Sequence, residues 1–318
     1  MNEFIDHAPS TSSMLKEVLV GLSQHQKSLP AKYFYDKKGS EIFEKICLLN
    51  EYYPAQAEAE ILTSYAKEIA AFLGESSLIL EPGSGSGQKI RFLLPHLLNT
   101  AGYVPIDIAK DMLLKMTDEI RKEFPSLNVM PICADFNQEM DLISIINNSD
   151  KKKVVFFPGS TIGNLTPVEA LNFLKKTGKL IGPGGGLLIG IDLKKNSKIM
   201  IEAYDDAGGV TADFNLNLLE RLNREVSASF DLNSFYHRAQ YNEKLGRIEM
   251  HLVSKEPQYI RVNETVFRFR VGETIHTENS YKYTTDEFTE LCAKARFKLR
   301  KLWKDHRDLF CVYFFEWE

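Results

Sequence analysis

The chain has 318 residues, which is enough for one large domain or two modest ones. Its net charge of -4 argues against a nucleic-acid partner, and its 44% hydrophobic and 26% charged residues are ordinary for a globular protein. No apolar stretch approaches the length of a membrane span, and the segment MNEFIDHAPSTSSM lacks the features of a secretory signal. Four scattered cysteines show no metal-ligand spacing and are expected to be reduced thiols. We therefore expect a cytoplasmic monomer without a metal and without a nucleic-acid or membrane partner.

The pattern of apolar residues in the first half of the chain predicts alternating helices and strands. An aromatic-rich segment, residues 29–56, precedes them and is expected to pack against the later insert. A helix is then predicted over 57–74, with Ile61, Tyr65, Ile69 and Phe72 on one face. Five apolar strands are predicted, over 76–83, 103–108, 127–136, 152–160 and 184–193. Helices are predicted between them, over 111–125 and 166–178, and the second opens with Thr166, Pro167 and Glu169 in a capping-box pattern. Apolar strands separated by helices predict a parallel, doubly wound, Rossmann-like sheet.

This pattern changes after Leu193. A helix over 204–226 precedes segments that read as antiparallel strands, over 235–253, 258–271 and 273–283. A helix over 284–296 and a final antiparallel pair over 297–318 follow. We therefore predict an α/β fold in which residues 57–194 and 284–318 form a Rossmann-like domain. Residues 1–56 and 195–283 are predicted to form a second, inserted α+β domain.

A glycine-rich loop follows the first predicted strand. Glu81, Gly83, Gly85 and Gly87 give the spacing E-x-G-x-G-x-G. A tight turn alone would use glycine here, but this spacing also lets the backbone approach a ligand closely beside an acid at the strand end. It fits the G-x-G-x-x-G dinucleotide pattern poorly and is similar to motif I of class I S-adenosylmethionine (SAM)-dependent methyltransferases. We favour a SAM-binding loop over a bare turn.

Two further strand ends support this interpretation. Asp107 ends the second strand, where a carboxylate can accept hydrogen bonds from both ribose hydroxyls. Asp135 and Phe136 end the third, where they could bind and stack on an adenine ring. The three strand ends border one crevice in a parallel sheet. Lys89 could be a solvated helix residue or a cation for the cofactor's carboxylate, and the residues alone do not decide between these roles.

From about residue 28 onward, the chain resembles the L-histidine Nα-methyltransferases of ergothioneine biosynthesis. The stretches that carry the resemblance are LPAKYFYDKKGSEIFEKI, NEYYPAQ, EPGSGSGQK, FFPGSTIGNLTP, AYDDAGGVTADFN, NLLERLNREV, RIEM and TENSYK. The chain departs from the family's more frequent residues at Pro158 and at Ser86–Gln88, which alter loop backbone and leave the polar site residues intact. The resemblance implies a SAM-dependent enzyme that trimethylates the α-amino group of L-histidine to hercynine. It also implies a Rossmann-like cofactor domain and a substrate domain built from the N-terminal segment and an insert.

The resemblance also implies residue roles. The cofactor would be bound by Gly83, Lys89, Asp107, Asp135 and Phe136, and the glycine-loop pattern described above adds Glu81 and Gly85 to this set. The substrate's amino and carboxylate groups would be held by Tyr52, Asn164 and Tyr204. The methyl-transfer region would be lined by Tyr35, Phe43 and Gly159, and the imidazole would be held by Met250, Glu278 and Ser280. Among these, Asn164 and Tyr35 are the candidate catalytic residues.

The residue types suit this chemistry. The nucleophile must be a neutral amine, because an ammonium has no lone pair, and Asn164 can accept from an amine N–H without a charge that favours ammonium. Tyr52 and Tyr204 can donate to a carboxylate. Tyr35 and Phe43 offer aromatic faces that tolerate a methylated ammonium through cation–π contact, worth about 0.5–2 kcal/mol each. Without the resemblance, Asn164 would read equally well as a turn residue and the aromatics as packing.

The run IHTENSYKYT is unusually polar for a strand. Glu278, Ser280 and Lys282 share one face of it, which suits either a solvated edge or the floor of a polar pocket. With the resemblance, Glu278 and Ser280 are expected to bond the two imidazole nitrogens, while the role of Lys282 stays open.

Three other functions compete with histidine methylation. The first is the same chemistry on an indole-bearing amino acid, which would not need Glu278. The second is a non-catalytic SAM-binding protein, and the third is an NAD-dependent dehydrogenase, for which the glycine spacing is wrong.

Overall fold

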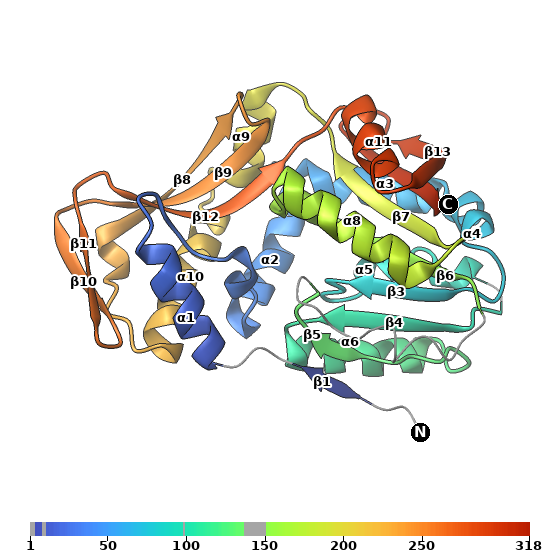
Figure 1. The fold of residues 1–318 in the computed structure, drawn as a ribbon, viewed down its shortest axis with the longest axis horizontal. Helices are drawn as coiled ribbons and strands as arrows, with labels where there is room; N and C mark the ends of the chain where they lie inside the picture. Colours follow the sequence, from blue (N-terminus) through green and yellow to red (C-terminus); the bar gives the residue numbers. More distant parts are fainter. Residues whose placement is uncertain (1–3, 8–10, 98, 137–150) are drawn as a thin grey trace. The chain divides into compact units, whose positions relative to one another are not determined.

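The computed structural model describes residues 4–7, 11–97, 99–136 and 151–318 (Figure 1). The chain divides into two compact units. The first unit comprises Met1–Ala8, Pro54–Lys194 and Tyr281–Glu318, and the second comprises Pro9–Tyr53 and Lys195–Ser280. Within the described ranges, no helix combines the length and apolarity needed to cross a membrane.

The first unit is built on an eight-stranded sheet. Its strand order is β1-β5-β4-β3-β6-β7-β14-β13. The parallel strands are β1 (Ile5–His7), β5 (Ile132–Ala134), β4 (Gly102–Asp107), β3 (Leu78–Pro82), β6 (Lys153–Phe157) and β7 (Gly186–Asp192). The last two, β14 (Phe310–Trp317) and β13 (Phe297–Lys304), are antiparallel to their neighbours. This confirms the predicted α/β sheet and its final antiparallel pair.

Helices cover both faces of this sheet. They are α3 (Tyr53–Ser64), α4 (Ala66–Leu73), α5 (Gln88–Arg91), α6 (Lys110–Glu123), α8 (Pro167–Ile181) and α11 (Thr285–Ala293), with short 3-10 turns η2 (Leu94–His96) and η3 (Thr161–Asn164). The predicted capping box of Thr166 and Glu169 opens α8, and Thr284 with Glu287 forms another at α11. These caps satisfy backbone N–H groups that a helix start leaves without partners.

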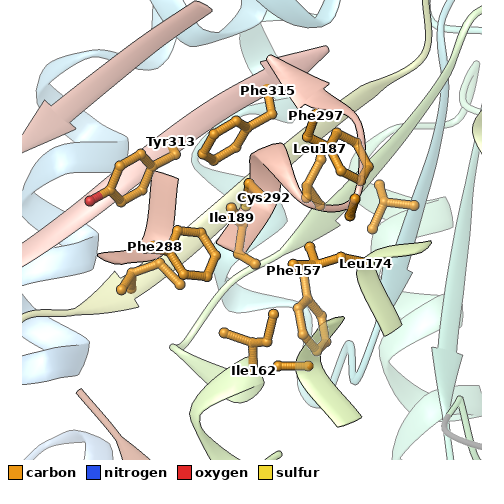
Figure 2. Packing of buried hydrophobic residues seen from close by; sticks show 14 of the residues in the cluster. Phe157, Ile162, Leu174, Leu187, Ile189, Phe288, Cys292, Phe297, Tyr313 and Phe315 are labelled. Carbon is orange, nitrogen blue, oxygen red and sulfur yellow. The ribbon is translucent and has the colours of Figure 1, made fainter. Parts of the chain in front are cut away.

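Two apolar cores follow from the alternation of side chains along the buried strands. Leu187 and Ile189 of β7 join one core, and Leu188 points into the other. Figure 2 shows the first core, where Phe288 of α11 lies near Ile189 of β7. Strands that bury both faces need side chains that are apolar at every position, which explains the unbroken apolar runs in the sequence.

The second unit combines helices with two small sheets. Its helices are α1 (Thr11–Leu22), α2 (Lys37–Cys47), α9 (Ser197–Tyr204) and α10 (Val210–Glu225), with 3-10 turns η1 (Ala31–Phe34) and η4 (Leu232–Ser234). A four-stranded sheet has the order β2-β12-β9-β8, made of β2 (Lys27–Ser28), β12 (Thr274–Tyr281), β9 (Arg247–Ser254) and β8 (Phe235–Asn242). A separate antiparallel hairpin consists of β10 (Gln258–Val262) and β11 (Thr265–Phe269).

The N-terminal part of the second unit is tied to its inserted part. Asp36 caps α2 by accepting from the Gly39 amide, and the same carboxylate accepts from Asn217 and Arg224 of α10. Phe34 stacks on Phe214 of α10 with ring centroids 4.5 Å apart. The aromatic-rich segment therefore packs against the insert, although the two lie far apart in the sequence.

The structure corrects several predicted elements. The helix predicted over 57–74 is two helices, because the backbone at Tyr65 leaves the helical region (φ -114°, ψ 14°). The strand predicted over 127–136 is confined to Ile132–Ala134, since Pro131 has no N–H to donate to a ladder. The helix predicted over 204–226 begins only at Val210, because Asp206 accepts from the Val210 and Thr211 amides at the start of α10, and Tyr204 instead ends α9.

Three of the predicted domain limits also differ from the observed units. Ile5–His7, predicted in the substrate domain, pairs in parallel with β5 in the sheet of the first unit. The first unit begins at Pro54 instead of residue 57, because α3 starts at Tyr53 and runs into the sheet core. It resumes at Tyr281 instead of residue 284, because Tyr281 and Tyr283 pack in that unit's apolar core.

Candidate active site

The glycine loop after β3 adopts backbone conformations that favour glycine. Gly83, Gly85 and Gly87 have φ values of 70°, 53° and 67°. The Gly83 amide donates to the Ile106 carbonyl at 2.7 Å, which ties the loop to the end of β4. A side chain at Gly85 would meet no atom within 4 Å, so the loop leaves open space beside it. These features fit a backbone cradle for a ligand at the carboxyl end of the sheet.

Asp107 links this loop to the next helix. One carboxylate oxygen accepts from the Gly85 amide at 2.8 Å and the other accepts from the Ala109 amide at 2.8 Å. Burial raises the pKa of Asp107, while these backbone donors oppose the rise. The residue therefore stands at the loop, as predicted, and it also fixes the loop's shape.

Glu81 lies beneath the loop. Its carboxyl group is buried and accepts from the Tyr103 hydroxyl at 2.5 Å. Burial raises the pKa of Glu81 to about 8, against the opposing effects of Tyr103 and Lys89. Glu81 therefore holds a proton at neutral pH and supports the loop from below.

Phe136 stands over the other side of the loop. Its Cε1 atom would lie 3.5 Å from a Cβ built on Gly83, and its ring contacts Phe157 and Phe173 edge-on. Asp135, which is buried, follows β5 directly. An open glycine loop, an aromatic ring, two carboxylates and a nearby lysine form a donor set that fits an adenosine carrying an amino-acid tail.

Lys89 is bound to a residue that the sequence analysis missed. Its Nζ lies 2.6 Å from Glu58 of α3, whose two oxygens also accept from the Gly159 amide at 2.8 and 2.9 Å. Glu58 falls on the same helical face as Ile61 and Leu62, so an acid on an apolar face was the signal available in the sequence.

The loop after β6 carries Asn164 at the end of η3. Gly159 and Ser160 both have positive φ values, 80° and 54°, and the Ser160 Oγ accepts from the Asp192 amide at 3.0 Å. A Cβ on Gly163 would lie 2.9 Å from the Tyr281 carbonyl oxygen, so this segment packs closely on the end of β12. The half-buried Asn164 is thereby held by a loop that is anchored at both ends.

The second unit gathers the predicted aromatic residues into one cluster. Ring contacts run from Tyr35 to Phe43 (5.7 Å), from Phe43 to Tyr52 (6.2 Å) and from Tyr52 to Tyr204 (5.9 Å). Phe214, absent from the predicted set, touches Tyr35 and Phe43 at 5.8 Å each. In the sequence, the spacing of Phe214 within α10 predicts only a residue on the buried face of a helix.

A hydrogen-bond chain positions Tyr204. Its hydroxyl lies 2.7 Å from Ser280 Oγ, and its backbone carbonyl lies 2.8 Å from His237 Nε2. Asn215 Nδ2 lies 2.8 Å from the other ring nitrogen of His237. Because an amide nitrogen can only donate, His237 accepts at Nδ1 and donates at Nε2 to the Tyr204 carbonyl. Burial lowers the pKa of His237, which keeps the ring neutral.

Glu278 and Met250 come from β12 and β9, which are neighbours in the sheet. The Thr277 hydroxyl donates to the Met250 carbonyl at 3.1 Å, and Met250 is buried. Burial raises the pKa of the Tyr52 phenol, and the nearby Tyr204, Cys47 and Glu278 add to the rise.

The predicted site residues thus divide between the units, each of which gathers its own set. The first unit holds Glu81, Gly83, Gly85, Lys89, Asp107, Asp135, Phe136, Gly159 and Asn164. The second holds Tyr35, Phe43, Tyr52, Tyr204, Met250, Glu278 and Ser280. Lys282, whose role the sequence left open, belongs to the first unit and forms a buried ion pair with Asp192.

Known proteins resemble this chain over nearly its whole length. A family model described as histidine-specific, SAM-dependent methyltransferases matches residues 14–317. The chain is 37% identical over 301 residues to histidine N-alpha-methyltransferase of Mycolicibacterium smegmatis, covering 93% of this chain and 92% of that protein. It is 38% identical over 299 residues to the protein of the same name from Mycobacterium tuberculosis, covering 92% and 91%. Ergothioneine biosynthesis protein 1 of Neurospora crassa is 27% identical over 275 residues, which are 85% of this chain and 31% of that protein.

A glycine loop with its strand-end acids stands in one unit, and an aromatic cluster with Glu278 stands in the other. The family match over residues 14–317 identifies the reaction class and the cofactor. The chain is a SAM-dependent N-methyltransferase and belongs to the family of histidine-specific, SAM-dependent methyltransferases.

Proposed function

We propose that this enzyme methylates the α-amino group of L-histidine, up to the trimethylated product hercynine, as a cytoplasmic monomer. The observation that carries the choice of acceptor is the position of Glu278 and Ser280 on β12. Ser280 is bonded to Tyr204, whose ring contacts Tyr52, and Glu278 lies two residues before Ser280 on the same strand, so a carboxylate and a hydroxyl share one face of β12 next to the aromatic cluster. An imidazole, with two nitrogens that donate or accept, suits these two partners. Identity to the two mycobacterial enzymes supports the same acceptor.

The residues of the first unit are proposed to bind SAM. Gly83 and Gly85 give the backbone cradle, Asp107 and Asp135 accept from the nucleoside, and Phe136 stacks on its base. Lys89 binds the carboxylate of the amino-acid tail. Bound SAM supplies an electrophilic methyl group on a sulfonium. Glu81 keeps its proton beneath the loop, and this limits negative charge next to the cradle.

The second unit is proposed to bind the amino acid. Tyr52 and Tyr204 donate hydroxyls to its carboxylate, and Met250 packs against the imidazole. Tyr35 and Phe43 present aromatic faces to the amine, which stay favourable as it becomes a quaternary ammonium. Repeated methylation needs such a site, because an N–H acceptor alone loses its partner as methyl groups accumulate.

Asn164 is proposed to select the reactive form of the amine. Its amide oxygen accepts from an N–H of the neutral amine and leaves the nitrogen lone pair aimed away from that bond. A neutral acceptor does not stabilise ammonium as a carboxylate would. Gly159 keeps this loop free of a side chain at the point where it meets Lys89.

A panel of free amino acids incubated with the enzyme and SAM, and read by mass spectrometry, tests this proposal. We expect mono-, di- and trimethylated histidine, with tandem spectra that place every methyl group on the α-nitrogen. Nα-acetylhistidine, whose amine is blocked, is the matched control and is expected to stay unmodified. Methylation of tryptophan in preference to histidine, or methylation of the imidazole, would contradict the proposal. Light scattering coupled to gel filtration measures the molar mass and so tests whether the protein is a monomer.

A further inference from the structure

Glu58 is a buried charged residue that none of the roles assigned above includes. It lies on α3, its side chain is 1% exposed, and its carboxylate has partners on two other segments. One partner is the Lys89 ammonium at 2.6 Å, and the other is the Gly159 amide, which donates to both oxygens at 2.8 and 2.9 Å. A carboxylate so deeply buried is stable only when it is paired and hydrogen-bonded.

The surrounding backbone leaves space for this carboxylate. A Cβ on Gly190 of β7 would lie 2.0 Å from Glu58 Oε1, so any larger residue at that position would displace the acid. A Cβ on Gly159 would lie 2.7 Å from Lys89 Nζ. Glycines on β7 and on the loop after β6 therefore permit the contacts that bring Glu58, Lys89 and Gly159 together.

The two partners belong to different parts of the chemistry. Lys89 follows the glycine loop, and its side chain is 31% exposed, so part of it is accessible to a ligand. Gly159 begins the loop that ends at Asn164. The Glu58 carboxylate therefore contacts both Lys89, which is proposed to bind the cofactor, and the loop that holds Asn164, which is proposed to bind the amine.

We propose that Glu58 is a positioning residue that fixes both Lys89 and the loop of residues 158–164. Through Lys89 it sets the affinity for the cofactor, and through Gly159 it sets the rate of methyl transfer at Asn164. This inference rests on the proposed roles of Lys89 and Asn164. Binding of S-adenosylhomocysteine needs no methyl acceptor, so its measurement stands whether or not histidine is the substrate.

The experiment is a double-mutant cycle of Glu58→Gln and Lys89→Met, with S-adenosylhomocysteine affinity measured by calorimetry. Glutamine keeps one oxygen that can accept from the Gly159 amide, but it places no negative charge next to the Lys89 ammonium. We expect E58Q to weaken binding about tenfold in the wild-type background and less than about twofold in the K89M background, because coupled neighbours are not additive. Glu60→Gln is the matched control, since Glu60 lies on the same helix with a 39% exposed side chain and binds His306 instead. It is expected to leave the affinity unchanged.

Turnover gives a second readout. With a methyl acceptor at saturation, E58Q is expected to lower kcat in both backgrounds, because the contact with Gly159 does not pass through Lys89. An equal loss of affinity in both backgrounds, or no loss in either, would overturn the proposal. If E58Q does not fold, Glu58→Asp, which keeps the charge but withdraws it from Lys89, is measured in the same two backgrounds by the same criteria.

Discussion

Replacing Lys282 by methionine should destabilise the first unit strongly. Lys282 Nζ lies 2.5 Å from Asp192 Oδ2, and both side chains are 0% exposed. Next to them, the Tyr283 amide donates to the Asp192 carbonyl at 3.3 Å, and the Lys194 amide donates to the Tyr283 carbonyl at 3.0 Å. The ion pair therefore fixes the segment that follows β12 against the end of β7.

The magnitude follows from the burial. Removing one partner of a fully buried pair leaves a charge without water or a counterion, and such changes lower the free energy of unfolding by about 3–5 kcal/mol. For a domain of 150–250 residues, each kcal/mol shifts the melting temperature by about 2–4 °C, so K282M should melt roughly 6–20 °C lower. Replacing both residues, as in K282M/D192L, should recover most of this loss, because an apolar pair leaves no buried charge.

Tryptophan fluorescence during urea unfolding is the appropriate assay. The chain has two tryptophans, Trp303 on β13 and Trp317 on β14, and both lie in the first unit. The signal therefore reports the unit that holds the ion pair, even if the second unit unfolds separately. Lys301→Met is the control, since its partner Glu68 has a 42% exposed side chain and little change is expected. A loss below about 1 kcal/mol for K282M would refute the reasoning, because a surface pair contributes that much.

Three further outcomes are expected. Glu278→Ala should raise the KM for histidine roughly ten- to hundredfold, because it removes a hydrogen bond to a charged group. The affinity for S-adenosylhomocysteine should stay unchanged. If calorimetry gives equal histidine affinities for the variant and the wild type, Glu278 does not hold the imidazole. Glu81 has a folded-state pKa of about 8 against an ordinary 4.5, so the folded protein retains a proton that the unfolded chain releases between these values. The free energy of unfolding should then fall as the pH rises from 5 to 8, by up to about 1.4 kcal/mol per unit relative to Glu81→Gln, and parallel profiles of the two proteins would contradict this. Asn164→Asp should move the ascending limb of the pH–rate profile to higher pH by about one unit, because a carboxylate favours the ammonium form of the substrate. Asn164→Ala should lower the rate without moving the profile. An unshifted N164D profile would count against the proposed role of Asn164 at the amine.

Local signals in the sequence predicted the features that depend on neighbouring residues. The capping box of Thr166 and Glu169 spans four positions, and the E-x-G-x-G-x-G pattern that begins at Glu81 spans seven, so each pattern is complete within one segment. The apolar strands of the sheet were recognised for the same reason. The break at Tyr65 was missed because the apolar periodicity of residues 57–74 continues across it.

Features that depend on distant partners could not be predicted in the same way. Glu58 reads as one more helix acid until Lys89 and Gly159 are placed beside it. His237 gives no signal in a strand until its contacts with Tyr204 and Asn215 are known. Lys282 stayed open because Asp192 lies on another strand. The cofactor residues could be named from their positions at strand ends, but the bonds from Asp107 to its own loop required the fold.

The position of β14 has a consequence for how this protein is made. β14 lies between β7 and β13, and its Phe310 pairs with Asp192 of β7. The ribosome synthesises the inserted part of the second unit after β7 and before β14. During that interval β7 has an unpaired edge, and unpaired edges of apolar strands promote association between nascent chains. The sheet of the first unit therefore cannot be completed until the insert has been synthesised. Slow translation or misfolding of the insert is expected to lower the yield of the first unit, although the insert contributes no strand to that sheet.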